Sequence, residues 1–304
     1  MIERLALAPS ANGPNNRRAR IQAQFDAVGV SWAGRFVAGA VMLALGACSI
    51  PGPDAQDDDM NKLPRKFLTL DAGYSLSYLE GGEANGRLVV FVHGTPGSAR
   101  GWADYLMNVP AGFHYIAVDR PGFGKSGPDE AVTSLAAQAS AVAALIRAQH
   151  AGPAILVGHS LGGPVVVQTA VDEPGLVSAL VILAGSVDPA QENVPFIQYM
   201  GDTWPVRAVL PRAMRNANRE IIYLKGELSR LEPRLGGIKI PVEIVHGMND
   251  DLVPFANVAF MKAHLTGATP LHVNEMPGQN HFLPWNAKTQ VDAAIAKATA
   301  AVSP

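Results

Sequence analysis

One stretch constrains the fold of this chain more than any other: an apolar run that stops at a glycine-bounded pentapeptide and then resumes. Ala154 to Val157 is a short run of the kind that forms a buried strand, Gly158-His-Ser-Leu-Gly162 follows, and Pro164 to Ala170 is again apolar and compatible with a helix. A strand that turns into a helix over so few residues forces the central residue into a strained conformation, and flanking glycines leave room for close backbone approach. The stretch predicts a strand–turn–helix unit with Ser160 at the turn.

The predicted turn carries two groups that can take part in a reaction. It lifts the hydroxyl of Ser160 above the edge of the sheet, where it can act as a nucleophile. The amide of Leu161 begins the helix, so its N–H lacks a helical partner and points toward any oxyanion that forms beside the serine. Because the chain holds 30 glycines, a G-x-S-x-G pattern counts only in the right context, and the alternative is a glycine-rich structural turn. The apolar runs on both sides favour the nucleophile.

The rest of the chain alternates strands with helices. Residues 67–70 and 75–79 flank a tight turn and predict an antiparallel hairpin at a sheet edge. Further strands are expected at 88–93, 113–118, 177–184, 241–246 and 271–275, and helices through Trp102 and Leu106 and at 134–150, 255–265 and 286–302. This alternation predicts an α/β fold with a doubly wound, mostly parallel sheet. Ligand sites in such sheets lie at the carboxyl ends of the strands.

The segment from about 188 to 238 departs from the alternation. It holds Phe196, Tyr199, Met200 and Trp204, followed by two predicted helices around 219–224 and 227–231. An insertion of this length is expected to lie above the strand ends as a small helical cap. Its aromatic residues either line a substrate pocket or fasten the cap to the body, and both roles need buried rings.

A serine hydroxyl needs a base to remove its proton, and the base needs a third group that fixes its tautomer. Among the eight histidines of the chain, His281 stands on a loop after the last predicted strand. Asp250 follows the preceding strand. Both are therefore expected at the same edge of the sheet as Ser160.

Together these motifs resemble those of the α/β-hydrolase fold serine hydrolases, over about residues 67–302. The resemblance rests on motifs that fall in family order: His93-Gly-Thr-Pro-Gly97, Asp119-Arg-Pro-Gly-Phe-Gly-Lys-Ser126, Gly158-His-Ser-Leu-Gly162, His246-Gly247 followed by Asp250, and Asn280-His281-Phe282. It implies an eight-stranded, mostly parallel sheet with a cap, and a triad of Ser160, Asp250 and His281. It also implies an oxyanion hole made by the amides of Leu161 and Thr95, and a reaction without cofactor or metal ion.

The resemblance also bears on the rival residues. The family spacing selects Asp250 and leaves its neighbour Asp251 facing solvent, while Asp188 stays open as an alternative acid because some members carry theirs there. Asp119 and Arg120 are expected to brace a loop, and His93 and His159 to support neighbouring groups. Gln279 and Asn280 stand where many members have Ala-Gly or Cys-Gly before the histidine, a departure that could change the flexibility of this loop without removing the base.

The amino-terminal region predicts a membrane anchor. Phe36 to Ala47 has the length of a signal-peptide apolar region and is too short to span a bilayer. Leu45-Gly-Ala-Cys48 resembles the bacterial lipobox, which implies cleavage before Cys48 and lipidation of that cysteine. The protein would then be lipid-anchored in the bacterial cell envelope, in the outer membrane or facing the periplasm. The alternative is a buried helix with an incidental cysteine.

These assignments divide the chain into three parts. Residues 1–47 are predicted to be a leader. Residues 1–34 do not resemble a normal signal-peptide start, and the true start is expected downstream of Met1, near Val28 or Val30. Residues 48–64, with Asp57-Asp-Asp59, are predicted to be a solvated tether, and 65–304 the hydrolase domain with its cap.

The function expected from the whole sequence is a lipid-anchored hydrolase of small-molecule carboxylic esters. A carbon–carbon bond or lactone hydrolase with the same triad is a second possibility, and a non-catalytic lipid-anchored binding protein is a third. A net charge of −2 without a sustained Lys/Arg cluster argues against nucleic acid as a partner. A serine at the turn in place of an aspartate argues against dehalogenase and epoxide hydrolase chemistry.

Overall fold

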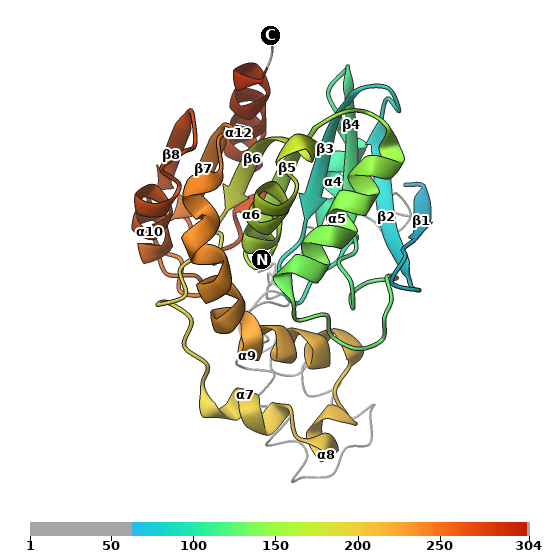
Figure 1. Ribbon diagram of the computed structural model, residues 1–304, viewed down its shortest axis with the longest axis vertical. Coiled ribbons are helices and arrows are strands. Elements are labelled where there is room, and N and C mark those ends of the chain that lie inside the picture. Colours follow the sequence, from blue (N-terminus) through green and yellow to red (C-terminus); the bar gives the residue numbers. More distant parts are fainter. Residues whose placement is uncertain (1–62, 303–304) are drawn as a thin grey trace, which may run out of the picture.

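The computed structural model describes residues 63–302, which form a sheet covered by helices on both faces (Figure 1). The sheet has eight strands in the order β1-β2-β4-β3-β5-β6-β7-β8. Their bounds are Arg65–Thr69 for β1, Ser75–Gly82 for β2, Arg87–Val92 for β3, Phe113–Val118 for β4, Ala154–His159 for β5, Val177–Leu183 for β6, Val242–Gly247 for β7 and Leu271–Met276 for β8. From β4 to β8 all neighbouring strands are parallel, which confirms the predicted sheet.

The predicted hairpin is also confirmed at the edge of the sheet. β1 and β2 pair antiparallel, with Arg65 opposite Leu79 and Thr69 opposite Ser75, and β2 continues antiparallel beside β4. The turn between them is closed by the amide of Leu70, which donates to the carbonyl of Tyr74 at 3.0 Å.

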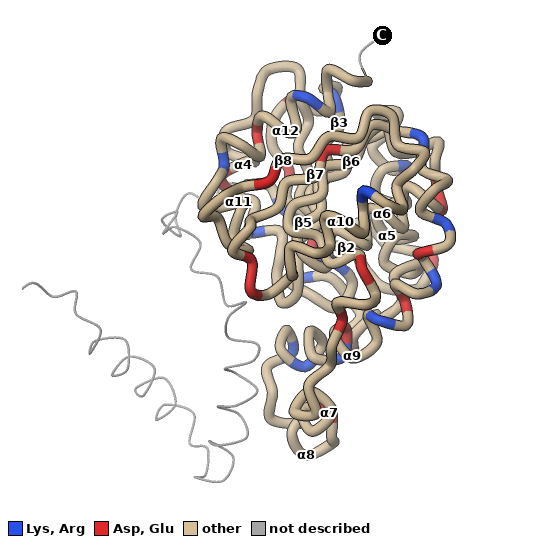
Figure 2. The backbone as a smooth tube through the Cα atoms, turned by 90° about the vertical axis from the view of Figure 1, so that its left-hand side faces the viewer, with Lys and Arg blue, Asp and Glu red and all other residues tan. Residues whose placement is uncertain are grey.

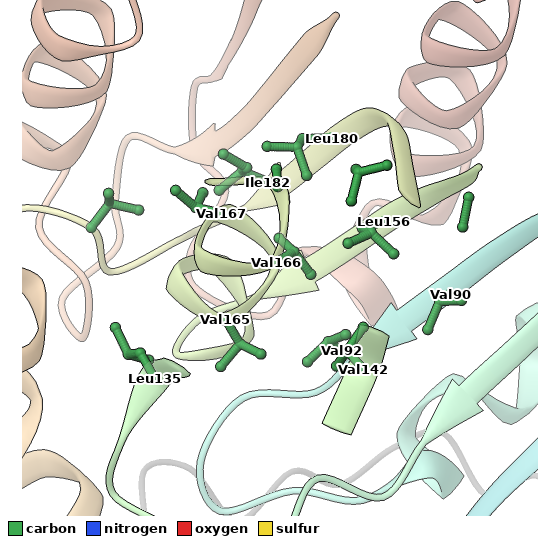
Figure 3. Packing of buried hydrophobic residues seen from close by; sticks show 14 of the residues in the cluster. Val90, Val92, Leu135, Val142, Leu156, Val165, Val166, Val167, Leu180 and Ile182 are labelled. Carbon is green, nitrogen blue, oxygen red and sulfur yellow. The ribbon is translucent and has the colours of Figure 1, made fainter. Parts of the chain in front are cut away.

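Alternation along the strands divides the core between the two faces of the sheet. Val90 and Leu156 belong to a cluster with side chains of α5 (Leu135–Gln149), α6 (Gly162–Asp172) and α10 (Ala256–His264), part of which Figure 3 shows. Phe91 and Val157 belong to a second cluster with α4 (Ala103–Met107) and α12 (Lys288–Ala301). Successive strand residues point to opposite faces, so strands covered on both sides are apolar throughout.

Short helical segments complete the body. The 3₁₀ helix η1 (Ala99–Trp102) leads into α4, η2 (Pro174–Leu176) leads into β6, and α11 (Leu283–Asn286) precedes α12. The helix α5 starts at Ser134, whose hydroxyl accepts the amide of Ala137 at 3.3 Å, and ends at His150 in the left-handed conformation. Serine is a residue type that helix starts favour, and the left-handed conformation of His150 ends the helix in a common way.

A small helical cap stands at one end of the molecule, where it projects from the body in both views (Figures 1 and 2). It consists of α7 (Phe196–Gly201), α8 (Trp204–Arg207), α9 (Arg212–Leu231) and the 3₁₀ helix η3 (Glu232–Gly237), all within the stretch predicted as an insertion.

The prediction of two helices around 219–224 and 227–231 is wrong, because α9 is one helix of 20 residues. Gly226 costs about 1 kcal/mol in a helix interior. Leu224, Leu228 and Leu231 nevertheless pack into the core cluster on this face of the sheet, and their burial holds the helix together across the glycine.

The expectation that the cap aromatics are buried is also wrong. Phe196 is 76% and Trp204 82% exposed, and Tyr199 is 51% exposed. The cap instead has a small aliphatic cluster of its own, Leu210 and Met214 with Ile197, Val206 and Ile221. Since α7 and α8 have only six and four residues, each buries one face there and leaves its aromatic side chains outside.

The predictions for the leader, for Cys48 and for most of the tether fall outside the described residues. Within residues 63–302, no helix is both long enough and apolar enough to cross a bilayer.

Candidate active site

The turn after β5 has the strained geometry that the sequence predicts. Ser160 has a φ of +56°, in the left-handed region, and α6 begins two residues later. Its amide donates to the carbonyl of Leu183 on β6 at 3.0 Å, and its carbonyl accepts from Gly163 at 2.9 Å. A residue with a Cβ pays a steric cost in this conformation, which persists because the packed strand and helix on either side define it.

The two glycines of the pentapeptide are needed for close packing. A Cβ on Gly158 would lie 2.4 Å from the carbonyl oxygen of Gly162, and one on Gly162 would lie 2.2 Å from the carbonyl oxygen of Val92. Both distances are far inside van der Waals contact. Glycine at these positions therefore lets α6 start directly against the ends of β3 and β5.

The structure brings Asp250 and His281 together on the loops that follow β7 and β8. His281 Nδ1 lies 2.8 Å from Asp250 Oδ2, and both residues are buried. Asp250 Oδ1 accepts the amides of Leu252 at 2.9 Å and Val253 at 2.8 Å. Each carboxylate oxygen thus has a defined role, one toward the backbone and one toward the histidine.

Asp250 is held as a carboxylate. Burial opposes its ionisation, yet the hydrogen bond and charge of His281, together with the amides of Val253 and Leu252, outweigh that cost and keep the pKa of Asp250 below its ordinary value. An ionised acceptor at Oδ2 requires a proton on His281 Nδ1, which leaves Nε2 free to accept one.

The rival acids lie elsewhere. Asp251 is exposed, as the spacing predicts. Asp188 is buried, but its carboxylate accepts the amide of Ala190 at 2.8 Å and the side chain of Gln191 at 3.2 Å within its own loop. Among the described residues Asp250 is the acid hydrogen-bonded to His281.

His159 connects the serine turn to the histidine loop. Its Nε2 lies 2.9 Å from the carbonyl oxygen of His281, and the two rings are 4.7 Å apart between centroids. Burial, helped by the charge of His281, lowers the pKa of His159 to about 3, so it stays neutral and donates from Nε2. It is a structural support, as expected.

No hydrogen bond joins Ser160 to His281 in the described chain, and such catalytic contacts often tighten only when substrate binds.

Two amides next to Ser160 are available as donors. Gly94 lies against the serine so closely that a Cβ there would be 2.8 Å from Ser160 Cβ and 3.2 Å from its Oγ. The amide of Thr95 follows Gly94, and the amide of Leu161 follows Ser160. Neither amide donates to another group in the part of the chain that the structure describes. This leaves both free to bind an oxyanion.

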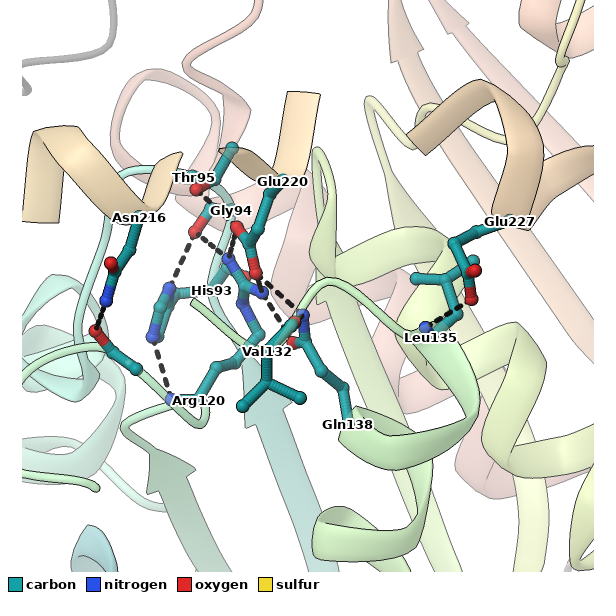
Figure 4. A network of polar contacts seen from close by, with 11 residues as sticks. His93, Gly94, Thr95, Arg120, Val132, Leu135, Gln138, Asn216, Glu220 and Glu227 are labelled. Carbon is teal, nitrogen blue, oxygen red and sulfur yellow. Dashed lines mark hydrogen bonds and ion pairs between the residues drawn. The ribbon is translucent and has the colours of Figure 1, made fainter. Parts of the chain in front are cut away.

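A buried polar network lies behind the loop of Gly94 (Figure 4). Arg120, with no exposed surface, donates to the carbonyls of His93 at 2.8 Å and Gly94 at 2.9 Å. Its guanidinium also binds both carboxylate oxygens of Glu220, at 2.6 and 3.0 Å, and the amide oxygen of Gln138 at 2.5 Å. Arg120 therefore braces the loop, as predicted, with a carboxylate from the cap as its counter-ion.

His93 has the supporting role that was expected. Its Nδ1 lies 2.6 Å from the carbonyl oxygen of Gly94, and its Nε2 accepts the backbone amide of Arg120 at 3.0 Å. Burial and the nearby charge of Arg120 lower the pKa of His93 to about 3. The neutral ring with its proton on Nδ1 satisfies both contacts.

Glu220 is the important residue that the sequence analysis missed. It lies on α9 at four, eight and eleven residues before Leu224, Leu228 and Leu231, which puts a carboxylate on the apolar stripe of the helix. A charged residue at such a position has to be paired when buried. That misplaced charge is the signal that could have identified it.

Among residues 63–302, no group of three His, Cys, Asp or Glu side chains is arranged to hold a metal ion.

Comparisons with known proteins identify one family and several relatives. A model of the alpha/beta hydrolase family matches residues 89–294. A non-heme chloroperoxidase of Streptomyces lividans is 28% identical over 243 residues, which cover 65% of this chain and 87% of that protein. Lipase LipV of Mycobacterium tuberculosis is 39% identical over 105 residues, 34% of this chain and 37% of that protein.

A solved structure supports the fold. The structure of E-2-(acetamidomethylene)succinate hydrolase superposes with a TM-score of 0.61 at 23% identity, covering 79% of this chain and 100% of that one. At this identity the likeness concerns the fold alone.

Proposed function

Because the chain belongs to the alpha/beta hydrolase family, we propose that it is a serine hydrolase that cleaves carboxylic esters through an acyl-enzyme. The observation that carries this proposal is the buried hydrogen bond of 2.8 Å between His281 and Asp250, on loops at the same sheet edge as the strained turn of Ser160. A nucleophile, a base and a buried acid are the three groups that acyl transfer by serine requires.

The first half of the reaction forms the acyl-enzyme. His281, with Nδ1 bonded to Asp250, takes the proton of Ser160 at Nε2 as the serine oxygen attacks the ester carbonyl. The carbonyl oxygen becomes an oxyanion bound by the amides of Leu161 and Thr95. The proton on His281 then passes to the leaving alcohol, and Ser160 keeps the acyl group.

The second half releases the acid. A water gives its proton to His281 Nε2 and attacks the acyl carbonyl, and the same two amides bind the oxyanion again. When that intermediate collapses, the proton returns to Ser160 and the carboxylic acid leaves. Asp250 stays ionised throughout and stabilises the charged form of His281.

The named relatives differ in the reactions that their names give, and the triad is common to several reactions, so substrate assays decide between an ester and another bond. A carbon–carbon bond or lactone hydrolase would use the same three residues, and a 2-hydroxy-6-oxononadienedioate/2-hydroxy-6-oxononatrienedioate hydrolase of a Pseudomonas species is 33% identical over 102 residues, 32% of this chain and 36% of that protein. A binding protein without catalysis would carry the same residues but leave Ser160 unreactive.

The test compares the wild-type protein with Ser160→Ala. We expect the wild type to take a fluorophosphonate label on Ser160 and to hydrolyse aryl esters of some acyl length, and the variant to do neither. A labelled serine with turnover only of a lactone or a vinylogous diketone would shift the assignment to the second class. An unlabelled serine in folded protein would support the binding protein.

We also propose that the protein is anchored to a membrane of the bacterial cell envelope through lipidated Cys48. The support is the lipobox-like Leu45-Gly-Ala-Cys48 after an apolar segment. Radiolabelled palmitate should enter the wild-type protein in cells and be absent from Cys48→Ala. Equal labelling of the two, or none in the wild type, would contradict the proposal.

A further inference from the structure

We infer that Glu220, on the cap helix α9, is a positioning residue that orients the amide of Thr95 toward the oxyanion. The reaction rate would thereby depend on the position of the cap relative to the body. The inference rests on the proposed function, because it concerns how one donor of the proposed oxyanion hole is held. Glu220 itself lies behind the loop and acts through its partners.

The carboxylate of Glu220 is bonded on both oxygens and is 2% exposed. Oε2 accepts the hydroxyl of Thr95 at 2.6 Å and Arg120 Nη2 at 3.0 Å. Oε1 accepts Arg120 Nη1 at 2.6 Å and the side-chain amide of Gln138 at 2.6 Å. A carboxylate from the cap thus completes a site whose other members, Thr95, Arg120 and Gln138, belong to the body.

These contacts determine where the Thr95 amide points. The bond between Gly94 and Thr95 is trans, so the carbonyl of Gly94 and the N–H of Thr95 point in opposite directions within one planar peptide. Arg120 and His93 hold the carbonyl of Gly94 from behind the loop, at 2.9 and 2.6 Å. The N–H of Thr95 therefore points away from the network, on a loop that lies directly against Ser160.

Glu220 holds this arrangement from two sides. It fixes the Thr95 side chain directly, and it neutralises the guanidinium that binds the Gly94 carbonyl. A buried guanidinium without its counter-ion would move toward other acceptors or toward water, since an unpaired buried charge is costly. Loss of Glu220 would release these two restraints and leave the contact from His93 as the remaining one on the carbonyl of Gly94.

Asn216 offers a matched control on the same helix. It is fully buried, and its side chain donates to the carbonyls of Gly122 at 2.8 Å and Asp129 at 2.9 Å. It thus joins α9 to the body one turn away from Glu220, through hydrogen bonds to carbonyls outside residues 93–95. Asn216→Ala loosens the cap without reaching the oxyanion loop.

The experiment measures kcat and KM for an aryl ester in Glu220→Gln, Thr95→Val, Thr95→Ser and Asn216→Ala. Removing an oxyanion donor costs about 100- to 1000-fold in kcat, so misaiming one should cost about 10- to 100-fold in Glu220→Gln and a smaller factor in Thr95→Val. KM should change little. Thr95→Ser keeps the hydroxyl and should retain most of the wild-type kcat. The kcat of Asn216→Ala should stay within about twofold of the wild-type value.

Two further readouts separate positioning from general loosening. The affinity for a trifluoromethyl ketone, which forms a tetrahedral oxyanion on serine, should fall with kcat in Glu220→Gln and Thr95→Val and stay unchanged in Asn216→Ala. In NMR spectra of isotope-labelled protein, the Thr95 amide signal should shift or broaden in Glu220→Gln and not in Asn216→Ala. The NMR readout needs no turnover.

Each outcome has a defined meaning. Equal losses in Glu220→Gln and Asn216→Ala, or unchanged kcat in both Glu220→Gln and Thr95→Val, would overturn the inference while Ser160-dependent hydrolysis in the wild type still stands. Absence of hydrolysis and of fluorophosphonate labelling in the wild type would instead refute the proposed function. In that case an unchanged Thr95 signal in Glu220→Gln would refute the positioning as well, and a shifted one would support it.

Discussion

Replacing Asp250 with asparagine should abolish most of the activity without disturbing the fold, and the reason lies in the two oxygens of the carboxylate. Oδ1 accepts two backbone amides, from Leu252 and Val253. In Asp250→Asn the amide oxygen has to take that position, because an NH₂ group there would face two donors. The NH₂ group is then directed at His281 Nδ1, where the carboxylate oxygen Oδ2 lies in the wild type.

That reversal forces the wrong tautomer on the base. With a donor facing it, His281 Nδ1 must accept, so the proton moves to Nε2 and the ring can no longer take the proton of Ser160. The equivalent change in a Ser-His-Asp enzyme lowers kcat by about 10⁴-fold, and we expect a loss of about 10³- to 10⁴-fold here, or about 4 to 5.5 kcal/mol of barrier. KM should change little, since the carboxylate does not touch substrate.

The neighbouring aspartate supplies the control. Asp251 is exposed, and Asp251→Asn removes the same charge one residue away and should leave kcat within about twofold. Both variants should be compared in aryl ester hydrolysis with thermal unfolding measured in parallel. A loss of less than about tenfold in folded Asp250→Asn, or an equal loss in Asp251→Asn, would refute the assignment of Asp250 as the acid.

Three further predictions follow from the geometry. Ser160→Gly should be more stable than Ser160→Ala by about 0.5 to 1 kcal/mol in urea unfolding, because glycine tolerates the φ of +56°; equal stabilities would argue against strain. Gly94→Ala should lower kcat at least about 100-fold, because its Cβ would lie 2.8 Å from that of Ser160; near-normal ester kinetics would argue against this packing. The pKa of His159 is lowered from 6.5 to about 3, so unfolding takes up a proton between these values and stability falls as the pH falls through this window. His159→Gln should reduce that slope by up to about 1.4 kcal/mol per pH unit, and identical slopes at pH 4 to 6 would contradict it.

Much of the fold follows from local patterns. Strands at 113–118 and 271–275 and the helix at 134–150 lie within a residue or so of their predicted bounds, since runs of apolar residues and Gly or Ser boundaries act over a few residues. The choice of Asp250 over Asp251 came from a resemblance in spacing, and the hydrogen bond to His281 agrees with it.

The cap is where local patterns failed. The predicted break between residues 224 and 227 does not occur, because leucines on both sides of Gly226 pack into a core made by residues far away in the chain. Phe196 and Trp204 are exposed because the two short helices bury their aliphatic side chains in the cap's own cluster.

By itself, the sequence determined the strand–turn–helix with Ser160 and the order of strands and helices, because these depend on neighbours within one or two turns of chain. Only the tertiary structure decided that Glu220 of the cap and Arg120 of the body share one buried ion pair behind the loop of Gly94 and Thr95. Residues 100 positions apart meet there, and no local periodicity records such a contact. The turn of Ser160 is a local property of the chain, whereas the surroundings of its proposed oxyanion hole belong to the whole fold.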